Sequence, residues 1–366
     1  MLAGESTEDD VEGTWQDILG DRMEEIIDRK RSSEQGREKA LAQYNYLLMA
    51  HYANDEVEGK LSELIPALLK SVKSDSSEKE ASLALRAIAL TLITSPSETL
   101  YDALEQTFKR IYTVSEYNSV KAGAIHALAA AAIYGGAGDG EIESIMDSFI
   151  EIIESDGTSI EAEDSGEVVA AAAEAWGFLA TYVDDLSETT EVAMEAFVEQ
   201  LESTDAAVQI AVGENIALCY EKSYTPIESD EEGYAIEKDT LVKRYDVYRQ
   251  QDQLEHTLRH LSKESARYIA KKDRKSLHQA FADILHSVEK PTLGPRYSEA
   301  LHKDTGKPLG SRMTIRIHKG GNVTINKWWK LHRLQGLRRI LGGGFVRHYM
   351  DNEVVFETLP IVINTD

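Results

Sequence analysis

Residues 168–182 read VVAAAAEAWGFLATY, a stretch in which alanine and larger apolar residues fill nearly every position. Three other stretches look alike: EASLALRAIALTLIT at residues 80–94, VKAGAIHALAAAAIY at 120–134 and AAVQIAVGENIALCY at 206–220. In each of them the polar residues form one narrow stripe, which is typical of a helix buried between neighbours. The four stretches therefore predict the inner helices of one continuous core.

The spacing of these stretches predicts a repeat array, because they begin 40, 48 and 38 residues apart. Amphipathic segments with a wide polar face lie beside them at residues 60–72, 98–113, 141–154 and 188–202. An outer amphipathic helix, a turn and an inner helix, repeated about every 40–47 residues, is the pattern of HEAT and armadillo arrays. Small residues on the inner helices let adjacent layers approach closely. Residues 15–29 and 34–52 predict two further helices that cap the array.

Local signals predict where some of these helices begin and end. Ser97, Ser187 and Asp205 stand at the starts of periodic segments, as N-caps do. The glycine-rich residues 135–140 are interpreted as a turn, because a phosphate-binding loop needs a preceding strand and a following Lys-Ser or Lys-Thr pair.

Charge divides the chain by position. Residues 1–240 contain 16 Lys and Arg against 51 Asp and Glu, whereas residues 241–350 contain 23 against nine. The two parts carry −35 and +14 within a total of −25. This asymmetry points to a polyanion as the partner of the basic part. The acidic part is interpreted as a solubilising surface, with repulsion of nucleic acid as the sharper alternative.

Several classes of protein are excluded by composition. The single cysteine, Cys219, rules out an internal disulfide framework and lies in an apolar stretch, so it is interpreted as a buried small hydrophobe. We expect no membrane span and no secretory signal. His256 and His260 are spaced as a helical metal pair but lack a third ligand, so we expect no metal site. The acidic residues 155–167 and 222–239 are interpreted as solvated loops rather than catalytic carboxylates.

The basic part begins with two predicted helices. Residues 241–268 place apolar side chains at helical spacing, and residues 271–275 (KKDRK) open the second helix. Cations at a helix N-terminus oppose the helix dipole. An anionic partner is therefore expected at residues 271–275.

The remaining residues predict a small module with strands and helices. Residues 313–318 (MTIRIH) alternate in polarity and, with a glycine-containing turn, predict a hairpin with residues 323–325. Residues 328–341 predict a cationic amphipathic helix, which the glycines at 342–344 end. Such a helix contacts nucleic acid, a membrane or a protein groove, and the −35 body disfavours an anionic membrane. Trp328 and Trp329 are interpreted as core or docking residues, with base stacking as the alternative.

These patterns predict a mostly α-helical protein: a HEAT- or armadillo-like α-solenoid followed by a small basic α+β module. The expected divisions are a disordered acidic tail (1–13), an acidic repeat region (14–222), an acidic linker (223–239), a basic helical pair closing the solenoid (240–290), a loop (291–312) and a basic C-terminal domain with short strands and helices (313–366).

Particular motifs resemble one known family. Residues 271–275 (KKDRK) and 281–285 (FADIL) are similar to the KKDRK and F-R-D-V-L stretches of the interferon-related developmental regulator family, with Ala282 where an Arg is usual. The basic helix, its glycines, Arg347-His348-Tyr349 and Asn352-Glu353 resemble that family's C-terminal domain. The resemblance covers essentially the whole chain, apart from the inserted-looking residues 292–311.

The resemblance implies a non-enzymatic regulator. Family members are described as transcriptional co-regulators and as factors that bind translationally inactive ribosomes, occupying tRNA sites and placing a C-terminal helix near the mRNA path. Direct contact with rRNA needs a cationic surface, so the +14 block favours the second role. We expect a monomeric cytoplasmic protein whose partners are rRNA and ribosomal proteins, joined by tRNA or elongation factors. The alternative is a nuclear transcriptional co-regulator or protein-interaction scaffold.

The candidate nucleic-acid-binding residues are cations of the basic part: Lys271, Lys272, Arg274, Lys275, Arg312, Arg316, Lys319, Lys327, Lys330, Arg333, Arg338, Arg339 and Arg347. We expect no catalytic residue, metal ligand or cofactor. A folded molecule in which these cations are scattered or paired with the chain's own carboxylates, leaving no open cationic face, would contradict the hypothesis.

Overall fold

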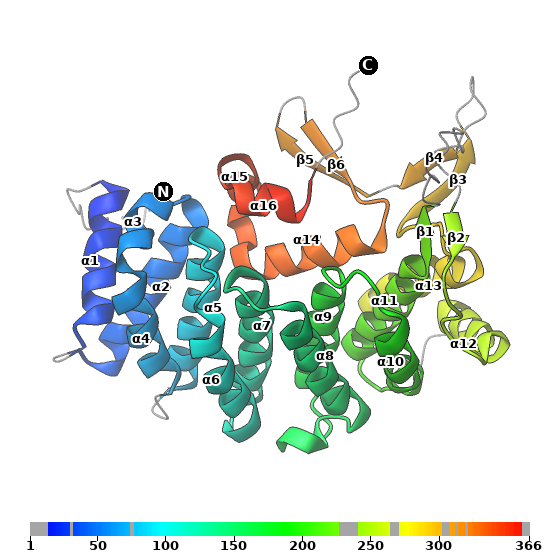
Figure 1. The fold of residues 1–366 in the computed structure, drawn as a ribbon, viewed down its shortest axis with the longest axis horizontal. Coiled ribbons are helices and arrows are strands. Elements are labelled where there is room, and N and C mark those ends of the chain that lie inside the picture. The colour runs from blue at the N-terminus through cyan, green and yellow to red at the C-terminus, as the bar shows by residue number, and fades with distance from the viewer. Residues whose placement is uncertain are drawn as a thin grey trace, which may run out of the picture.

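The computed structural model describes residues 14–29, 32–73, 77–226, 241–263, 271–301, 308–311, 313–318 and 321–360. Helices stand side by side in a long row that bends into a shallow arc (Figure 1). The C-terminal helices lie along the inner side of this arc. Among the described residues, no helix combines the length and apolar character needed to cross a bilayer.

The row has two layers. The inner layer consists of α5 (Glu78–Thr94), α7 (Asn118–Tyr134), α9 (Gly166–Ala180) and α11 (Ala206–Lys222), each packed against the next. Each packs against one outer helix: α4 (Leu61–Val72), α6 (Tyr101–Val114), α8 (Asp139–Glu154) or α10 (Ser187–Gln200). The array begins with α1 (Trp15–Ile27), α2 (Glu34–Ala50) and α3 (Asn54–Val57), and includes the 3-10 turns η1 (Glu58–Lys60) and η2 (Thr158–Ile160). The predicted solenoid is confirmed.

Helix α9 illustrates why these sequences form an inner layer. All its residues are buried except Gly166, Glu167 and Glu174. Alanine side chains leave room for α7 and α11 on either side, while Trp176 packs edge-on against Phe197 of α10, with ring centroids 4.8 Å apart. Removing this apolar surface from water contributes roughly 25 cal/mol per Å². Tertiary packing therefore holds the helix in place.

The predicted helix starts are only partly correct. Asp205 is an N-cap, because its Oδ1 accepts from the backbone N–H groups of Ala207 (2.7 Å) and Val208 (3.3 Å). The other two predictions are wrong, since α10 begins at Ser187 itself and α6 begins at Tyr101. The backbone N–H of Ser97 instead donates to the carbonyl of Tyr134 at 3.0 Å, so this residue joins the turn between repeats.

The predicted turn is confirmed at residues 135–138, whereas residues 139 and 140 already belong to α8. Gly135 ends α7, and Gly136 has φ of +92°, a conformation that favours glycine. A Cβ atom on Gly136 would lie 2.4 Å from the carbonyl oxygen of Glu98. The close approach of two backbones thus requires glycine here.

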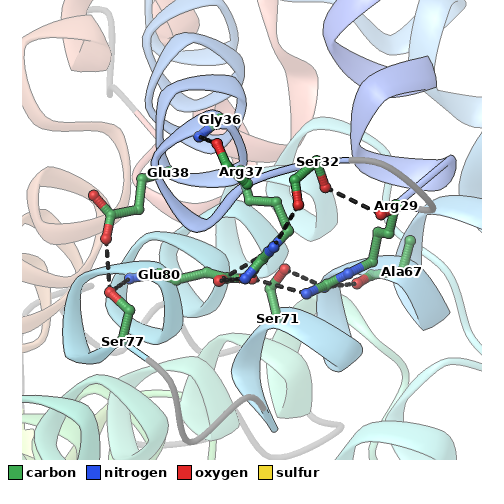
Figure 2. Close-up of polar contacts among 10 residues, drawn as sticks. Arg29, Ser32, Gly36, Arg37, Glu38, Ala67, Ser71, Ser77 and Glu80 are labelled. Carbon is green, nitrogen blue, oxygen red and sulfur yellow. Dashed lines mark hydrogen bonds and ion pairs between the residues drawn. The ribbon is translucent and has the colours of Figure 1, made fainter.

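A buried ion network fastens the first helices to the array (Figure 2). The Glu80 carboxylate of α5 is fully buried and accepts from Arg37 Nη2 at 2.8 Å and from Arg29 Nη2 at 2.9 Å. Arg29 also donates to Ser71 Oγ of α4 at 2.5 Å. Burial alone would raise the pKa of Glu80, but hydrogen bonds from Arg37 and the positive charges of both arginines lower it below its usual value. The network joins α2, α4 and α5.

After the acidic array the chain forms two further helices, α12 (Gln251–Lys263) and α13 (Lys271–Glu289), and α13 packs against α11. The prediction of a helix over residues 241–250 is wrong. Strand β2 (Leu241–Lys243) instead pairs antiparallel with β1 (Tyr224–Pro226). Val242, Tyr245 and Tyr248 belong to residue types that favour extended backbone, and this tertiary pairing outweighs the helical spacing.

Two more hairpins precede the last helices. Strands β5 (Thr314–His318) and β6 (Gly321–Thr324) pair antiparallel, which confirms the predicted hairpin. Strands β3 (Tyr297–Leu301) and β4 (Pro308–Ser311) also pair, within the stretch expected to be a loop. Pro308 is the first residue of β4, a place where a strand tolerates the missing backbone donor.

The C-terminal helices are α14 (Trp328–Leu341), the 3-10 turn η3 (Gly342–Gly344), α15 (Phe345–Asp351) and α16 (Glu353–Thr358). The predicted glycine end of the basic helix is confirmed, because Gly342 is its C-cap with φ of +52°. Helix α14 packs against α5, α9 and α11, so it crosses several repeats (Figure 1). The basic helix is therefore part of the array's inner face.

Candidate nucleic-acid interface

A carboxylate from the array holds the N-terminus of α14. Glu221, near the end of α11, accepts from the backbone N–H groups of Trp328 (2.9 Å) and Trp329 (3.0 Å). Both donors lack an intrahelical partner, and the helix dipole favours a negative charge beside them. Burial raises the pKa of Glu221, whereas these two hydrogen bonds oppose the rise. The Trp328 indole also donates to Ser287 Oγ of α13 at 2.7 Å, so the interpretation of Trp328 as a docking residue is confirmed.

Arg333 is committed to contacts within the chain. Its Nε donates to Thr181 Oγ1 (3.0 Å), its Nη2 to the Thr181 carbonyl (2.9 Å) and its Nη1 to the Thr358 carbonyl (3.1 Å). Its guanidinium carbon lies 4.1 Å from the centroid of the Tyr182 ring. A planar fork that donates to two carbonyls and stacks on a ring is difficult to replace by lysine. Arg333 thus joins α14, the end of α9 and α16.

Glycines on both helices allow α14 to lie close to α9. A Cβ atom on Gly177 of α9 would lie 2.5 Å from the His332 ring, and one on Gly336 of α14 would lie 2.6 Å from Phe178 Cδ2. His332 is buried, and burial lowers its pKa to about 4. The imidazole is therefore neutral at neutral pH and does not add to the cationic surface.

The family-like residues after the glycines are docking groups in this structure. His348 is buried, and its Nε2 donates to the Leu48 carbonyl of α2 at 2.6 Å. Asn352 Nδ2 donates to the Ile93 carbonyl of α5 at 2.9 Å. Tyr349 donates its hydroxyl to the Leu359 carbonyl at 2.7 Å. The contacts of His348 and Asn352 attach the C-terminal helices to α2 and α5, and that of Tyr349 joins α15 to the residue after α16.

Polar groups with shifted pKa values lie between α14 and the array. Arg339 pairs with Glu174 of α9 at 2.8 Å, so its charge is also engaged within the chain. Gln335 Nε2 donates to Glu214 Oε2 of α11 at 2.9 Å. Burial raises the pKa of Glu214 to about 7 and raises that of Glu174. Burial and the nearby Arg339 charge lower the pKa of His126 well below its usual value.

Four of the candidate residues are at least partly exposed to solvent. Arg316 on β5 and Arg338 on α14 are exposed, while Lys327 and Lys330 at the start of α14 are half-buried. No ion pair joins any of these four to a carboxylate in the part of the chain that the structure describes. We refer to Arg316, Lys327, Lys330 and Arg338 as the open cations. Those from Lys327 to Arg338 extend over about 16 Å of helix at 1.5 Å per residue.

The contacts of Lys330 and Arg347 complete this inventory. The Lys330 ammonium has no carboxylate partner among the described residues. It donates to Asn326 Oδ1 at 3.0 Å and lies 5.6 Å from the centroid of the Trp329 ring. Arg347 is exposed, yet it pairs with Asp351 one turn along α15 at 2.6 Å. Arg347 therefore offers less free charge than the open cations.

Other candidate residues lie where the structure gives no side-chain description. Helix α13 begins at Lys271, so the KKDRK motif occupies its first turns as predicted. The structure describes the backbone but not the side chains of Lys271, Lys272, Arg274 and Lys275. Arg312 and Lys319 lie outside the described residues.

The acidic array pairs with some cations that follow it. Arg244 lies 3.1 Å from Asp185 and Arg249 lies 3.1 Å from Glu191, and both pairs are largely exposed. Exposed ion pairs contribute at most about 1 kcal/mol. Among the described residues that follow the array, exposed cations without an ion pair therefore remain on α14 and β5, and also at Lys263 of α12 and at Lys290.

Cys219 and the metal-ligating residue types offer no competing site. Cys219 is buried, and burial raises the pKa of its thiol to about 12, which confirms its interpretation as a buried hydrophobe. Within the described ranges, no group of three His, Cys, Asp or Glu side chains is placed to hold a metal ion.

Sequence reasoning missed the groups that position α14. Glu221 lies more than 100 residues before the helix N-terminus that it caps, and it stands near the end of a mostly apolar helix. Arg333 has the same residue type as Arg338, five positions away, although only Arg333 faces the array. A helical-wheel comparison of the apolar positions of α14 could have separated the two.

Comparison with known proteins gives two similarities. A sequence profile described as "Interferon-related developmental regulator (IFRD)" matches residues 1–289, which include the array and extend to the end of α13. The chain is also similar to an uncharacterized protein of Schizosaccharomyces pombe, with 29% identity over 343 residues that cover 92% of this chain and 72% of that protein. The repeat array and the motifs at residues 271–275 and 281–285 lie within the matched residues, and the chain belongs to the interferon-related developmental regulator family.

Proposed function

We propose that this protein is a non-enzymatic regulator that binds ribosomes and contacts rRNA through its C-terminal elements. The observation that carries the proposal is the set of open cations on α14 and β5. Among the described residues, no carboxylate pairs with them, although the chain as a whole carries −25. Phosphate neutralisation by Lys and Arg is the main source of affinity for nucleic acid. An acidic array of this charge repels RNA elsewhere, so it restricts docking to the basic face.

The rigid attachment of α14 supports the same proposal. Glu221, Arg333 and the glycine contacts fix the helix in one position relative to the repeats. Cations on a fixed helix contact phosphates at a lower cost in conformational entropy than cations on a flexible tail. A fixed basic helix suits a structured RNA partner, whose phosphates are themselves held in place.

Co-sedimentation with purified ribosomes tests the proposal. The variant Arg316→Gln, Lys327→Gln, Lys330→Gln, Arg338→Gln removes four charges without touching the docking contacts, and we expect its ribosome affinity to fall at least 30-fold. The matched control, Lys60→Gln, Lys70→Gln, Lys73→Gln, Lys109→Gln, removes four charges from the array and should bind as the unchanged protein does. Equal binding by all three proteins would refute the proposed surface, provided that circular dichroism shows each to be folded.

Affinity capture distinguishes the nuclear alternative. A co-regulator that works only through proteins needs no open cationic face. Recovery of rRNA and ribosomal proteins from starved cells supports ribosome binding. Recovery of chromatin factors without rRNA would support the transcriptional role instead.

A further inference from the structure

A pocket of about 450 Å³ opens beside the start of α14, where separate parts of the chain meet. Its lining includes Thr181 from the end of α9, Glu221 and Lys222 from α11, and Lys327, Trp329 and Arg333 from α14 and its N-cap. Pockets of 300–1,000 Å³ are the usual size for small-molecule and cofactor sites. The pocket adjoins the open cations because Lys327 belongs to both.

The lining is cationic overall. Lys222, Lys327 and Arg333 face one carboxylate, that of Glu221. Both Glu221 oxygens already accept backbone hydrogen bonds at the start of α14, so this charge is directed into the helix end. The surplus of positive charge favours an anionic ligand.

Lys222 contributes a half-buried cation with hydrogen-bonding capacity to spare. Its ammonium group donates to the Val183 carbonyl at 2.5 Å, which uses one of three N–H donors. Burial lowers the pKa of Lys222, and the nearby charges of Arg333 and Arg244 act in the same direction, whereas Asp184 and Glu221 oppose them. An anion in the pocket would relieve this repulsion between neighbouring cations.

The remaining wall is apolar and aromatic. Leu241, Pro291 and the half-buried Trp329 line it, together with Tyr224. The guanidinium carbon of Arg333 lies over the Trp329 ring, 5.1 Å from its centroid, so the two groups are adjacent in the pocket wall. Aromatic rings and guanidinium planes are the surfaces against which unpaired bases pack.

We propose that this pocket takes one unpaired nucleotide of a single-stranded RNA, with its phosphate beside Lys327 and Lys222 and its base against the wall formed by Trp329. The assignment rests on the proposed function, which supplies RNA as the source of the nucleotide. A base that is stacked in a duplex is not available to such a pocket, because the neighbouring base pairs enclose it. The pocket would therefore recognise an end, a bulge or a single-stranded segment.

Fluorescence anisotropy with fluorescein-labelled hexauridylate tests the assignment on the full chain. The variant Lys327→Gln removes one pocket charge at a position whose side chain makes no capping hydrogen bond within the described residues, so it should fold normally. We expect its affinity for hexauridylate to fall at least 10-fold. The control variant Lys70→Gln alters an exposed cation of α4, outside the pocket and outside the open cations, and we expect a change of less than threefold. Equal affinities of Lys327→Gln and the unchanged protein would overturn the assignment.

Competition identifies the source of the nucleotide. Unlabelled hexauridylate should displace the probe, whereas a blunt-ended RNA duplex or free uridine monophosphate should need at least 10-fold higher concentrations. Displacement by the duplex at the same concentration would overturn the unpaired state, and displacement by the monophosphate at the same concentration would overturn RNA as the source. A Trp329→Leu variant keeps an apolar wall but removes the ring, and we expect at least a fivefold loss of hexauridylate affinity.

Parallel ribosome co-sedimentation separates this inference from the proposed function. If the unchanged protein binds ribosomes but hexauridylate binding is absent or independent of Lys327, the pocket assignment fails and ribosome binding stands. If hexauridylate binds in a Lys327-dependent way but ribosomes do not bind, the pocket assignment stands and the ribosomal role fails.

Discussion

Replacement of Arg333 by lysine separates a docking role from an RNA-binding role, because it retains the charge and removes the planar fork. In the structure, Arg333 makes three hydrogen bonds to Thr181 and Thr358 and stacks on Tyr182. A lysine can restore at most one of these bonds in the same geometry. Two lost bonds from a charged donor, at about 1.5 kcal/mol each for a half-buried group, give a loss of about 3 kcal/mol.

Hydrogen exchange of the α14 backbone amides measures this loss directly. The docked helix is protected by the contacts of Arg333, so a loss of about 3 kcal/mol makes its opening roughly 150-fold more frequent. We expect amides of α14 in Arg333→Lys to exchange about 100-fold faster, while those of the distant α1 keep their rates. The control Arg338→Lys alters an exposed arginine of the same helix and should leave exchange unchanged.

An increase of less than fivefold in Arg333→Lys would refute the docking role. Ribosome co-sedimentation adds the functional readout: loss of binding in Arg333→Lys, with retention in Arg338→Lys, is expected if helix position matters as well as charge. Retention of full affinity by Arg333→Lys alongside rapid α14 exchange would show that docking of the helix is dispensable for binding.

Four further outcomes are expected. Glu80→Gln leaves Arg29 and Arg37 without their buried carboxylate and should destabilise the α1–α2–α5 region by about 3–5 kcal/mol, measured by urea unfolding, and a loss below 1 kcal/mol would contradict the network. The pKa of Glu214 is raised to about 7 from 4.5, so this carboxyl lowers the free energy of unfolding by up to about 3 kcal/mol above pH 7 and does not lower it below pH 4.5. Glu214→Gln should therefore raise thermal stability at pH 8 but not at pH 4.5. With four open cations on phosphates, the logarithm of ribosome affinity should fall with the logarithm of salt at a slope of about −3 to −4, and a flat response would indicate an apolar protein contact. If the α13 cations bind rRNA, reversal of all four charges should abolish ribosome co-sedimentation, and unchanged binding would reject that role. These cations are Lys271, Lys272, Arg274 and Lys275.

The array could be predicted from sequence because its signals are local. Each inner helix carries its own alanine-rich pattern, and each outer helix its own polar face, so the period and the order of elements follow without knowledge of contacts. The error at residues 241–250 arose where spacing was compatible with a helix but a distant partner, β1, supplied the hydrogen bonds. Local periodicity cannot report such pairing.

The candidate site was predicted less completely for the same reason. The sequence located the basic helix and its glycine end, yet it assigned one role to Arg333, Arg338 and Arg339. Their differences depend on Thr181, Tyr182 and Glu174, which lie about 150 residues earlier. Composition identifies the charge, and only tertiary contacts decide which charges remain open.

The placement of α14 across α5, α9 and α11 has a consequence for how the molecule is made. Helical repeats normally contact only their immediate neighbours, so the two ends of such an array can move relative to each other. Here α14 follows all of these repeats in the sequence and braces early repeats against late ones, through contacts of long sequence separation that form slowly. Before α14 is synthesised, the repeats have only their neighbour contacts, and the array becomes stiffer once α14 docks.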